Sequence, residues 1–580
     1  SIGKLVKGMA PHWKIHTLDE KQKALCESLS NELKISPLSA QLLIDRGIST
    51  ADEARAFVRP SLSQLHDPFL MRDMDKAVER LSKAIAEHER IMVYGDYDVD
   101  GTTAVALMYT FLRTQTDNLI FYIPDRYTEG YGISYKGIDT ALKEKCTLIV
   151  SLDCGIKAVD KVEYASAKGI DFIICDHHTP GVELPQAVAV LNMKRADCGY
   201  PYKELSGCGV GFKLVQAYIH KHHISEEKAY VLLPLLAMSI ASDIVPVTGE
   251  NRILAYYGLR QLNKRPPVGV YAIMQVAGIA DRIITISDLV YKIGPRINAC
   301  GRIKSGAEAV RLLITDNPAF AQQQAADINT YNAERKDYDS KTTEEALQML
   351  YSDPDNDRKH TTVVFSPDWH KGVIGIAASR LTEHYYRPTI VLTAGENGII
   401  SGSARSVGDF DIYSAIDSCH DLLTNFGGHK FAAGLSMLEK NLNAFKQRFE
   451  DYVSAHITPD QLQPTINIEA EIRLDDITPQ FFNILRHLEP FGLGNPRPIF
   501  VTHNLINNHA TRRVGQQGTH LHLDVTDRTA AIAGIAFGQG DKALHLQNGN
   551  SADICYHLEE NTFNHRTTIQ MTAIDIHLNN

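Results

Sequence analysis

Short apolar runs alternate with amphipathic segments along most of the chain. The apolar runs lie at residues 90–94, 118–123, 147–152, 170–175 and 187–191. Helix-like periodicity lies between them, at residues 77–88, 102–114 and 159–168. Runs this short are typical of buried strands. Strands separated by helices predict an α/β fold with a parallel, doubly wound sheet.

The pattern changes three times along the chain. Small helices precede residue 76, and a polar segment without Gly or Pro follows Asn317-Pro318, which is a favourable helix start. A smaller strand–helix–strand unit then precedes a region of period-two alternation, which is typical of a small closed barrel. We therefore predict an N-terminal extension (1–75), a large α/β domain (76–316), a connecting helix (317–352), a second α/β domain (353–457) and a barrel (464–580).

Acidic residues and histidines follow several of the predicted strands. Asp96, Asp98 and Asp100 follow the first strand, Asp153 follows the third, and Asp176-His177-His178 follows the fourth. Right-handed crossovers bring the carboxyl ends of parallel strands to one edge of the sheet, where ligands bind in such folds. We expect these side chains to converge there. Asp243, just past the apolar helical stretch 230–240, is a weaker candidate, because helix ends often carry acids.

This set of side chains points to divalent cations. Closely spaced carboxylates do not all stay ionised without a cation, and hard ions take oxygen ligands. Imidazole tilts the choice towards Mn²⁺ over Mg²⁺, and the number of ligands suggests two ions. Zinc is disfavoured because no Cys-rich ligand set is present. An EF-hand is excluded because Leu107 stands at the twelfth position of the loop, where a Glu is needed.

Composition narrows the class of protein. The chain is 44% hydrophobic and 22% charged, with a net charge of −10, which argues against a uniformly basic nucleic-acid binder. No apolar run is long enough for a membrane span, and the residues before Met9 contain no apolar core of a secretory signal. Nine cysteines without a C-x-x-C pair fit reduced thiols and a cytoplasmic protein.

Basic side chains accompany three strand ends or glycine-rich stretches. Arg126 follows a strand end, and the other candidates are Arg296, Asn298 and Arg302 in one glycine-rich loop and Ser403 and Arg405 in another. Arginine binds phosphate in a bidentate manner, so we interpret these groups as phosphate contacts. For any one of them alone, an ordinary surface role would be the simpler interpretation.

Together these motifs resemble the DHH phosphoesterase superfamily. The resemblance is carried by Gly-Asp-Tyr-Asp-Val-Asp-Gly at 95–101, Ser-Leu-Asp-Cys-Gly at 151–155, Asp-His-His at 176–178 and Ser-Asp at 242–243. Supporting stretches lie at 294–302, 370–376, 402–406, 427–434 and 490–496, so the resemblance covers nearly the whole chain. Within the superfamily, the chain is most similar to bacterial single-strand-specific 5′→3′ DNA exonucleases.

The resemblance implies a DHH domain, a long connecting helix, a DHHA1 domain and an OB-fold. It assigns metal binding to Asp98, Asp100, Asp153, His177 and Asp243, with Asp96 in or near the ligand shell. It assigns contact with the scissile phosphate to His178, the 5′-phosphate pocket to Arg126, Ser403 and Arg405, and a substrate loop to Gly427, Gly428 and His429. Tyr94 departs from some relatives, which have a histidine there.

The implied activity is hydrolysis of single-stranded DNA from its 5′ end in repair and recombination, with release of nucleoside 5′-monophosphates. A narrow groove between the two α/β domains would exclude duplex DNA, and the OB-fold would stack bases on aromatic side chains. The enzyme would be a monomer working beside a single-strand-binding protein and a helicase. The alternatives are a phosphodiesterase for short oligonucleotides or cyclic dinucleotides, a non-catalytic single-strand-binding scaffold, and an α/β protein with a structural metal.

Overall fold

The computed structural model describes residues 10–580, so the segment before Met9, in which no secretory signal is expected, lies outside the described residues. The chain forms two compact units. Unit I comprises Ala56–Arg335 together with Leu488–Pro496. Unit II comprises the N-terminal residues up to Arg55, Lys336–His487 and Arg497–Asn580.

A five-stranded parallel sheet forms the centre of unit I, as predicted. Its order is β3 (Leu119–Tyr122), β2 (Ile91–Gly95), β4 (Leu148–Leu152), β5 (Asp171–Cys175) and β6 (Ala189–Leu191). The chain runs from β2 to β3 on one side and then returns past β2 to β4 on the other. The crevice at the carboxyl ends of β2 and β4 is therefore the topological switch point, where ligands bind in open α/β sheets.

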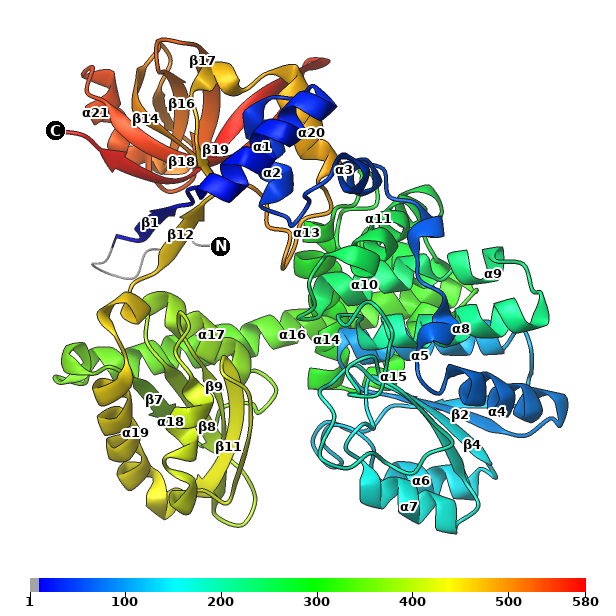
Figure 1. The fold of residues 1–580 in the computed structure, drawn as a ribbon. Helices are drawn as coiled ribbons and strands as arrows, with labels where there is room; N and C mark the ends of the chain where they lie inside the picture. The colour runs from blue at the N-terminus through cyan, green and yellow to red at the C-terminus, as the bar shows by residue number, and fades with distance from the viewer. Residues whose placement is uncertain (1–9) are drawn as a thin grey trace. The chain divides into compact units, whose positions relative to one another are not determined.

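Helices cover both faces of this sheet (Figure 1). Val93 and Val150 belong to the core shared with α4 (Met74–Ala86), α5 (Val99–Leu112) and α8 (Gly207–His222). Met92 and Ile149 belong to the core shared with α6 (Tyr135–Lys143) and α7 (Val159–Ala167). Successive strand residues point to opposite faces, so a sheet that is covered on both sides requires continuous apolar runs.

The remainder of unit I is helical. Its elements are α9 (Glu227–Tyr230), α10 (Leu233–Ser242), α11 (Gly249–Lys264), α12 (Val268–Val276), α13 (Ile286–Asp288), a π-helical turn (Leu289–Ile293), α14 (Gly294–Ile303) and α15 (Gly306–Ile314). The sequence analysis predicted a glycine-rich loop for Arg296, Asn298 and Arg302. This prediction is wrong, because all three residues lie in α14. Its glycines serve close packing: a Cβ on Gly294 would be 2.8 Å from Ser242 Oγ.

The predicted connecting helix is α16 (Pro318–Tyr351), a single helix of 34 residues. Asn317 caps it, since its Oδ1 accepts hydrogen bonds from the N–H groups of Ala319 and Phe320 at 3.0 and 3.2 Å. The helix begins in unit I and continues into unit II, where Trp369 Nε1 donates to Glu345 at 2.7 Å.

Unit II contains the second α/β sheet. The order is β10 (Asn425–Gly428), β11 (Ala432–Leu438), β9 (Ile399–Arg405), β8 (Thr389–Ala394) and β7 (Thr362–Phe365), with α17 (Ile374–His384), α18 (Ile412–Asp417) and α19 (Leu442–His456) packed on it. Ser403 and Arg405 were expected in a loop, which is wrong: both lie in β9. Gly402 permits close strand packing there, since its Cβ would be 2.7 Å from the Val391 carbonyl.

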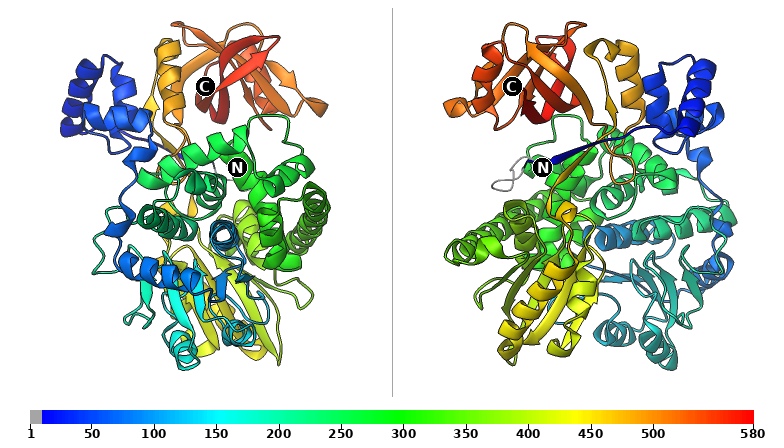
Figure 2. Two further views of the ribbon diagram at one scale, coloured as in Figure 1. Left: turned by 90° about the vertical axis from the view of Figure 1, so that its right-hand side faces the viewer. Right: turned by 60° about the vertical axis from the view of Figure 1, so that its left-hand side comes forward.

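The predicted barrel is present in the C-terminal part of unit II. Its strands are β13 (Ala470–Glu471), β14 (Phe500–Asn507), β15 (Arg512–Val514), β16 (His520–Thr526), β17 (Ala531–Ala536), β18 (Ala552–Phe563) and β19 (Arg566–Leu578), with α20 (Pro479–His487) and α21 (Ala543–Gln547). Pairing of β14 with β16 closes the ring β14–β18–β19–β17–β16. Figure 2 shows these strands curving around one another in two further views.

The N-terminal helices α1 (Glu20–Leu33), α2 (Pro37–Ile44) and α3 (Ala51–Val58) were expected, but the strand β1 (His12–Ile15) was not. It pairs in parallel with β12 (Thr465–Ile468). Among residues 10–580, no helix combines the length and the apolar content that a bilayer span requires. All nine cysteines are free thiols and all are buried.

Candidate active site

Strand ends and helix starts bring the predicted acids together at the switch point. β2 ends at Gly95, and α5 begins at Val99 with Asp98 as its N-cap, whose Oδ1 accepts a hydrogen bond from Gly101 N–H at 2.7 Å. The helix starts earlier than its apolar periodicity indicated. Asp100 therefore lies in the first turn of α5 and not in an extended continuation of β2.

His177 lies at the centre of the acidic cluster. Its Nε2 is 2.9 Å from Asp153 Oδ1, 3.4 Å from Asp100 Oδ2 and 3.5 Å from Asp243 Oδ2. Two groups of ligand atoms lie within 4.8 Å of one another and could each hold an ion. One comprises Asp153, His177 and His178, and the other comprises Asp100, His177 and Asp243. The convergence expected from the sequence is therefore present.

The electrostatics of the cluster fit a divalent cation. Burial and then the neighbouring charges of Asp100 and Asp98 raise the pKa of Asp153 well above its usual range. Burial and the charge of Asp100 raise the pKa of Asp243 to about 7. Asp153 Oδ1 and Asp243 Oδ2 are buried and accept no hydrogen bond of acceptable geometry among residues 10–580, although His177 Nε2 lies within 3.5 Å of each. A cation at these oxygens would replace the missing partners and stabilise the ionised carboxylates.

The two histidines differ in protonation. Burial lowers the pKa of His177 to about 4, so its imidazole is neutral at pH 7 and can serve as a metal ligand. Burial also opposes the charge of His178, but a 2.6 Å hydrogen bond between its Nδ1 and the Asp176 carboxylate raises its pKa to about 9. His178 is the more exposed of the pair, with 44% of its side chain accessible. A cationic, accessible imidazole suits contact with a phosphate.

Asp100 is held by donors that the sequence analysis missed. Its carboxylate accepts hydrogen bonds from the N–H groups of Gly207 and Cys208, both at 2.8 Å, and from Ser239 Oγ at 2.7 Å. Gly207 and Cys208 form the N-terminus of α8, where the helix dipole favours an anion. Ser206 before an apolar-periodic stretch is a readable helix start. The hydrogen bonds from this helix start to Asp100 could not be predicted, because the two lie far apart in the sequence.

Asp96 and Tyr94 organise the neighbouring loop. Asp96 accepts hydrogen bonds from Tyr97 N–H at 3.1 Å and from Gly132 N–H at 3.0 Å. The Tyr94 hydroxyl donates to the Gly132 carbonyl at 2.8 Å and accepts from Ser134 N–H at 2.9 Å. Neither side chain belongs to the two groups that could hold an ion. The loop also carries Tyr131, whose hydroxyl donates to the Asp153 carbonyl at 3.1 Å.

The expected phosphate contacts have different surroundings. Arg126 in unit I lies over the Tyr97 ring, with its Cζ 5.1 Å from the ring centroid. Arg296 is engaged within unit I, since its Nε donates to Asn329 at 3.1 Å and its Nη1 donates to the Lys292 carbonyl at 2.7 Å. Asn298 is half-buried in α14, as is Arg302, whose carbonyl accepts a hydrogen bond from the Tyr127 hydroxyl.

Within unit II, Ser403 and Arg405 lie on the same face of β9, next to the start of α17. A Cβ on Gly375 would be 2.7 Å from Arg405 Nη2 and 3.5 Å from Ser403 Oγ. Gly428 allows a tight turn after β10, because its φ is +144° and a Cβ would be 2.4 Å from the Ala432 carbonyl. The turn presents His429 on the surface.

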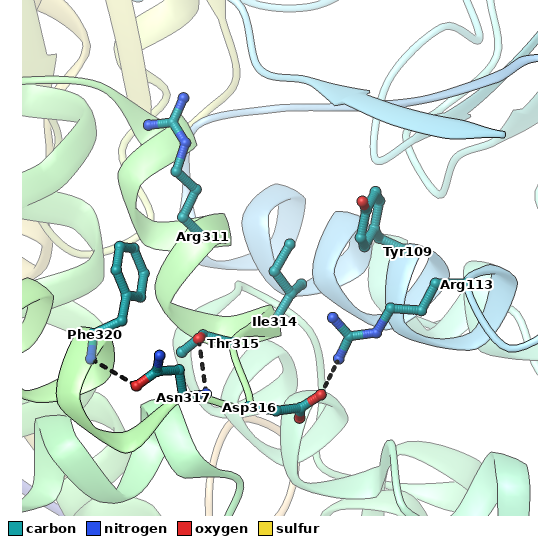
Figure 3. A pocket seen from close by; sticks show the side chains of 8 residues that line it. All are labelled: Tyr109, Arg113, Arg311, Ile314, Thr315, Asp316, Asn317 and Phe320. Atoms are coloured by element: carbon teal, nitrogen blue, oxygen red, sulfur yellow. Dashed lines mark hydrogen bonds and ion pairs between the residues drawn. The ribbon is translucent and has the colours of Figure 1, made fainter. Parts of the chain in front are cut away.

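Unit I contains several cavities. One of about 320 Å³ borders the acidic cluster and is lined in part by Tyr131, Ile156, Lys161 and His178. A second, of about 620 Å³, lies at the far end of α5 and contains Arg113, which pairs with Asp316 at 3.5 Å (Figure 3). None of the predicted site residues lines the second cavity.

Comparison with known proteins agrees with this architecture. Residues 90–240 match the DHH family N-terminal domain, residues 357–455 match the DHHA1 domain, and residues 468–575 match the RecJ OB domain. These matches confirm the three domain types that the resemblance implied.

Similar proteins cover nearly the whole chain. The chain is 34% identical to the single-stranded-DNA-specific exonuclease RecJ of Bacillus subtilis, over 97% of this chain and 70% of that protein. It is 31% identical to the RecJ of Escherichia coli, over 96% of this chain and 98% of that protein. The crystal structure of Thermus thermophilus RecJ in complex with Mn²⁺ superposes with a TM-score of 0.82 at 27% identity, covering 97% of this chain and 79% of the other. A Mg²⁺ complex from the same organism has a TM-score of 0.77. With this full-length similarity, this chain belongs to the RecJ family of single-stranded-DNA-specific exonucleases.

Proposed function

We propose that this protein hydrolyses single-stranded DNA from the 5′ end and releases nucleoside 5′-monophosphates. The observation that carries the proposal is the convergence of Asp100, Asp153, His177 and Asp243, with two buried carboxylate oxygens that lack hydrogen-bond partners among the described residues. Divalent ions bound at such ligands lower the pKa of a water and stabilise negative charge on the attacking and leaving oxygens of a phosphodiester.

The residues of unit I then have separate roles. Asp153, His177, Asp100 and Asp243 would hold the ions, and Asp98, which is half-buried, supplies a further carboxylate beside them. His178 binds the scissile phosphate as a cation, and Asp176 keeps its imidazole protonated and oriented through the 2.6 Å hydrogen bond. The 320 Å³ cavity beside His178 offers room for part of a nucleotide.

We assign recognition of the 5′ end of the DNA strand to basic and hydroxyl side chains of the protein. Arg126 makes no ion pair among the described residues, and stacking over Tyr97 orders its guanidinium. Ser403 and Arg405 meet at the N-terminus of α17, where backbone N–H groups favour an anion. We assign these three side chains to the 5′ phosphate, with Gly428 and His429 as further contacts. We assign Arg296, Asn298 and Arg302 on α14 to further phosphate contacts.

The proposal extends to the surroundings of the enzyme. The enzyme would act as a monomer in the cytoplasm, in DNA repair and recombination. A helicase would produce its single-stranded substrate, and a single-strand-binding protein would work beside it. The nine buried free thiols are compatible with a reducing compartment.

The decisive experiment uses DNA labelled at either end. Single-stranded and blunt duplex substrates carrying a 5′ or a 3′ label are incubated with the protein and Mn²⁺, Mg²⁺ or a chelator. Ordered loss of the 5′ label from single strands, with no loss in chelator, is the expected result. Degradation from the 3′ end, or equal attack on blunt duplex, contradicts the proposal.

A further inference from the structure

The segment Leu488–Pro496 lies in the sequence between α20 and β14, yet it belongs to unit I, whereas the residues on both sides belong to unit II. The segment is a tight turn. Gly492 and Asn495 exchange backbone hydrogen bonds of 2.9 and 3.1 Å. The buried Asn495 side chain donates to the carbonyls of Leu488 and Pro490, both at 2.9 Å. These bonds fix the shape of the turn.

The turn packs against the stretch that follows Asp243. Val247 N–H donates to the Leu493 carbonyl at 2.6 Å. A Cβ on Gly492 would be 2.5 Å from Val247 Cγ2, and a Cβ on Gly494 would be 2.9 Å from Pro246 Cβ. Two glycines therefore allow an approach that side chains would prevent.

This stretch begins at a predicted cation ligand. Only three residues separate Asp243 from Val247, and the Asp243 carboxylate accepts a hydrogen bond of 2.9 Å from the N–H group of Ile244. Its other oxygen, Oδ2, is buried without a hydrogen-bond partner among residues 10–580. Asp100, by contrast, is held by α8 and by Ser239. The Asp243 carboxylate is thus positioned by α10, whose C-cap it is, by His177 Nε2 at 3.5 Å and by the backbone that follows it, and of these only the following backbone contacts the turn.

We infer that the turn Leu488–Pro496 is a positioning element for Asp243, so that cation affinity in unit I depends on a segment carried by the C-terminal region. Residues that orient a metal ligand typically change metal affinity by about 10- to 100-fold when they are altered. The inference rests on the proposed role of Asp243 as a ligand, and Asp243→Asn tests that role separately.

The first test compares two glycines of nearly equal conformation. Gly494 has φ +75° and faces Pro246, whereas Gly538 in the barrel has φ +73° and nothing within 4 Å of its Cβ position. Gly494→Ala and Gly538→Ala therefore impose similar backbone strain, and only Gly494→Ala pushes against the stretch after Asp243. Calorimetric titration of the metal-free, full-length proteins with Mn²⁺ should show an approximately tenfold higher Kd for Gly494→Ala alone.

A second pair of variants removes backbone strain from the comparison. Gly492→Ala places a methyl group 2.5 Å from Val247 Cγ2, whereas Gly199→Ala meets nothing within 4 Å, and neither glycine has a positive φ. Gly492→Ala should weaken Mn²⁺ binding, and Gly199→Ala should not. Saturating Mn²⁺ should restore most of the nuclease rate of Gly492→Ala, because the ligands themselves are intact.

Hydrogen exchange of the unaltered protein gives a test that no folding defect can obscure. Coupling is reciprocal, so Mn²⁺ should slow amide exchange in 488–496 as well as in 243–249. Slower exchange in 243–249 alone, or unchanged Mn²⁺ affinity in both folded glycine variants while Asp243→Asn weakens it, overturns the positioning role. If Asp243→Asn itself leaves Mn²⁺ affinity unchanged, the ligand assignment fails instead.

Discussion

Gly207 lies so close to Asp153 that a Cβ on the glycine would be 2.5 Å from the carboxylate Oδ1. The same glycine donates its N–H to Asp100. One residue at the start of α8 thus sets the position of two acids from separate elements, because Asp100 lies in the first turn of α5 and Asp153 follows β4.

Gly207→Ala should therefore impair the cation site. The methyl group would displace the Asp153 carboxylate, and we expect Mn²⁺ to bind about tenfold more weakly or worse. The matched control is Gly209→Ala in the same helical turn, where a Cβ would make ordinary contacts of 3.4 Å or more. Calorimetric titration of both variants checks the prediction, and equal affinities would contradict it.

Replacing a side chain that is assigned to cation binding should abolish hydrolysis of DNA. Metal ions contribute several kcal/mol to phosphodiester hydrolysis, so Asp153→Ala and His177→Ala should each lower kcat by about 10³-fold or more. Asp160→Ala, an exposed acid in α7, serves as the control. The rate of release of nucleotides from 5′-labelled single strands is the measurement. Substantial activity in a purified Asp153→Ala protein is incompatible with the assigned site.

Arg405→Ala should weaken recognition of the 5′ phosphate. Loss of one charge-assisted hydrogen bond costs roughly 1–3 kcal/mol, so the affinity advantage of 5′-phosphorylated over 5′-hydroxyl strands should fall by about that amount. Arg448→Ala, which removes an arginine ion-paired to Asp421 on the surface of the same domain, should leave the preference intact. Binding is measured by fluorescence anisotropy in a chelating buffer, to prevent cleavage.

The barrel should show a pH-dependent stability that involves His557. Burial lowers the pKa of His557, whose Nδ1 lies 2.9 Å from the Pro498 carbonyl, near the charges of Arg497 and Glu559. The unfolded chain binds the proton more readily, so this contribution is fully present above the unfolded pKa of about 6.5 and declines as the pH falls.

The comparison is between the wild-type protein and His557→Gln. The Tm advantage of the wild type should be largest near pH 8 and should shrink towards pH 5. A difference that stays constant across this range would show that His557 does not titrate in the expected way.

The sheet of unit I and the acids at its edge could be predicted because both depend on local sequence. Apolar runs such as 147–152 end directly at an acid, and parallel topology then determines where that acid lies. The partner of Asp100 could not be predicted in this way, because Gly207 lies more than one hundred residues away. Its approach depends on the packing of α8 against α5.

Glycines were the main source of error. Gly294 and Gly402 were interpreted as signs of loops, but α14 and β9 are regular elements in which a missing side chain permits close packing. A sequence shows where Cβ is absent but not whether a turn or a neighbouring backbone requires that absence. Period-two alternation does not predict the strand β14, because its polar residues Thr502, His503 and Asn504 interrupt the apolar alternation.

The burial of every thiol gives the protein a set of internal probes. Cys154 follows Asp153 directly, and Cys208 donates its N–H group to Asp100. Because both side chains are buried, an alkylating reagent can modify them only when the surrounding structure opens. The rate of alkylation at these two cysteines, resolved by mass spectrometry, therefore reports how often the acidic cluster opens, without introducing a label or a mutation.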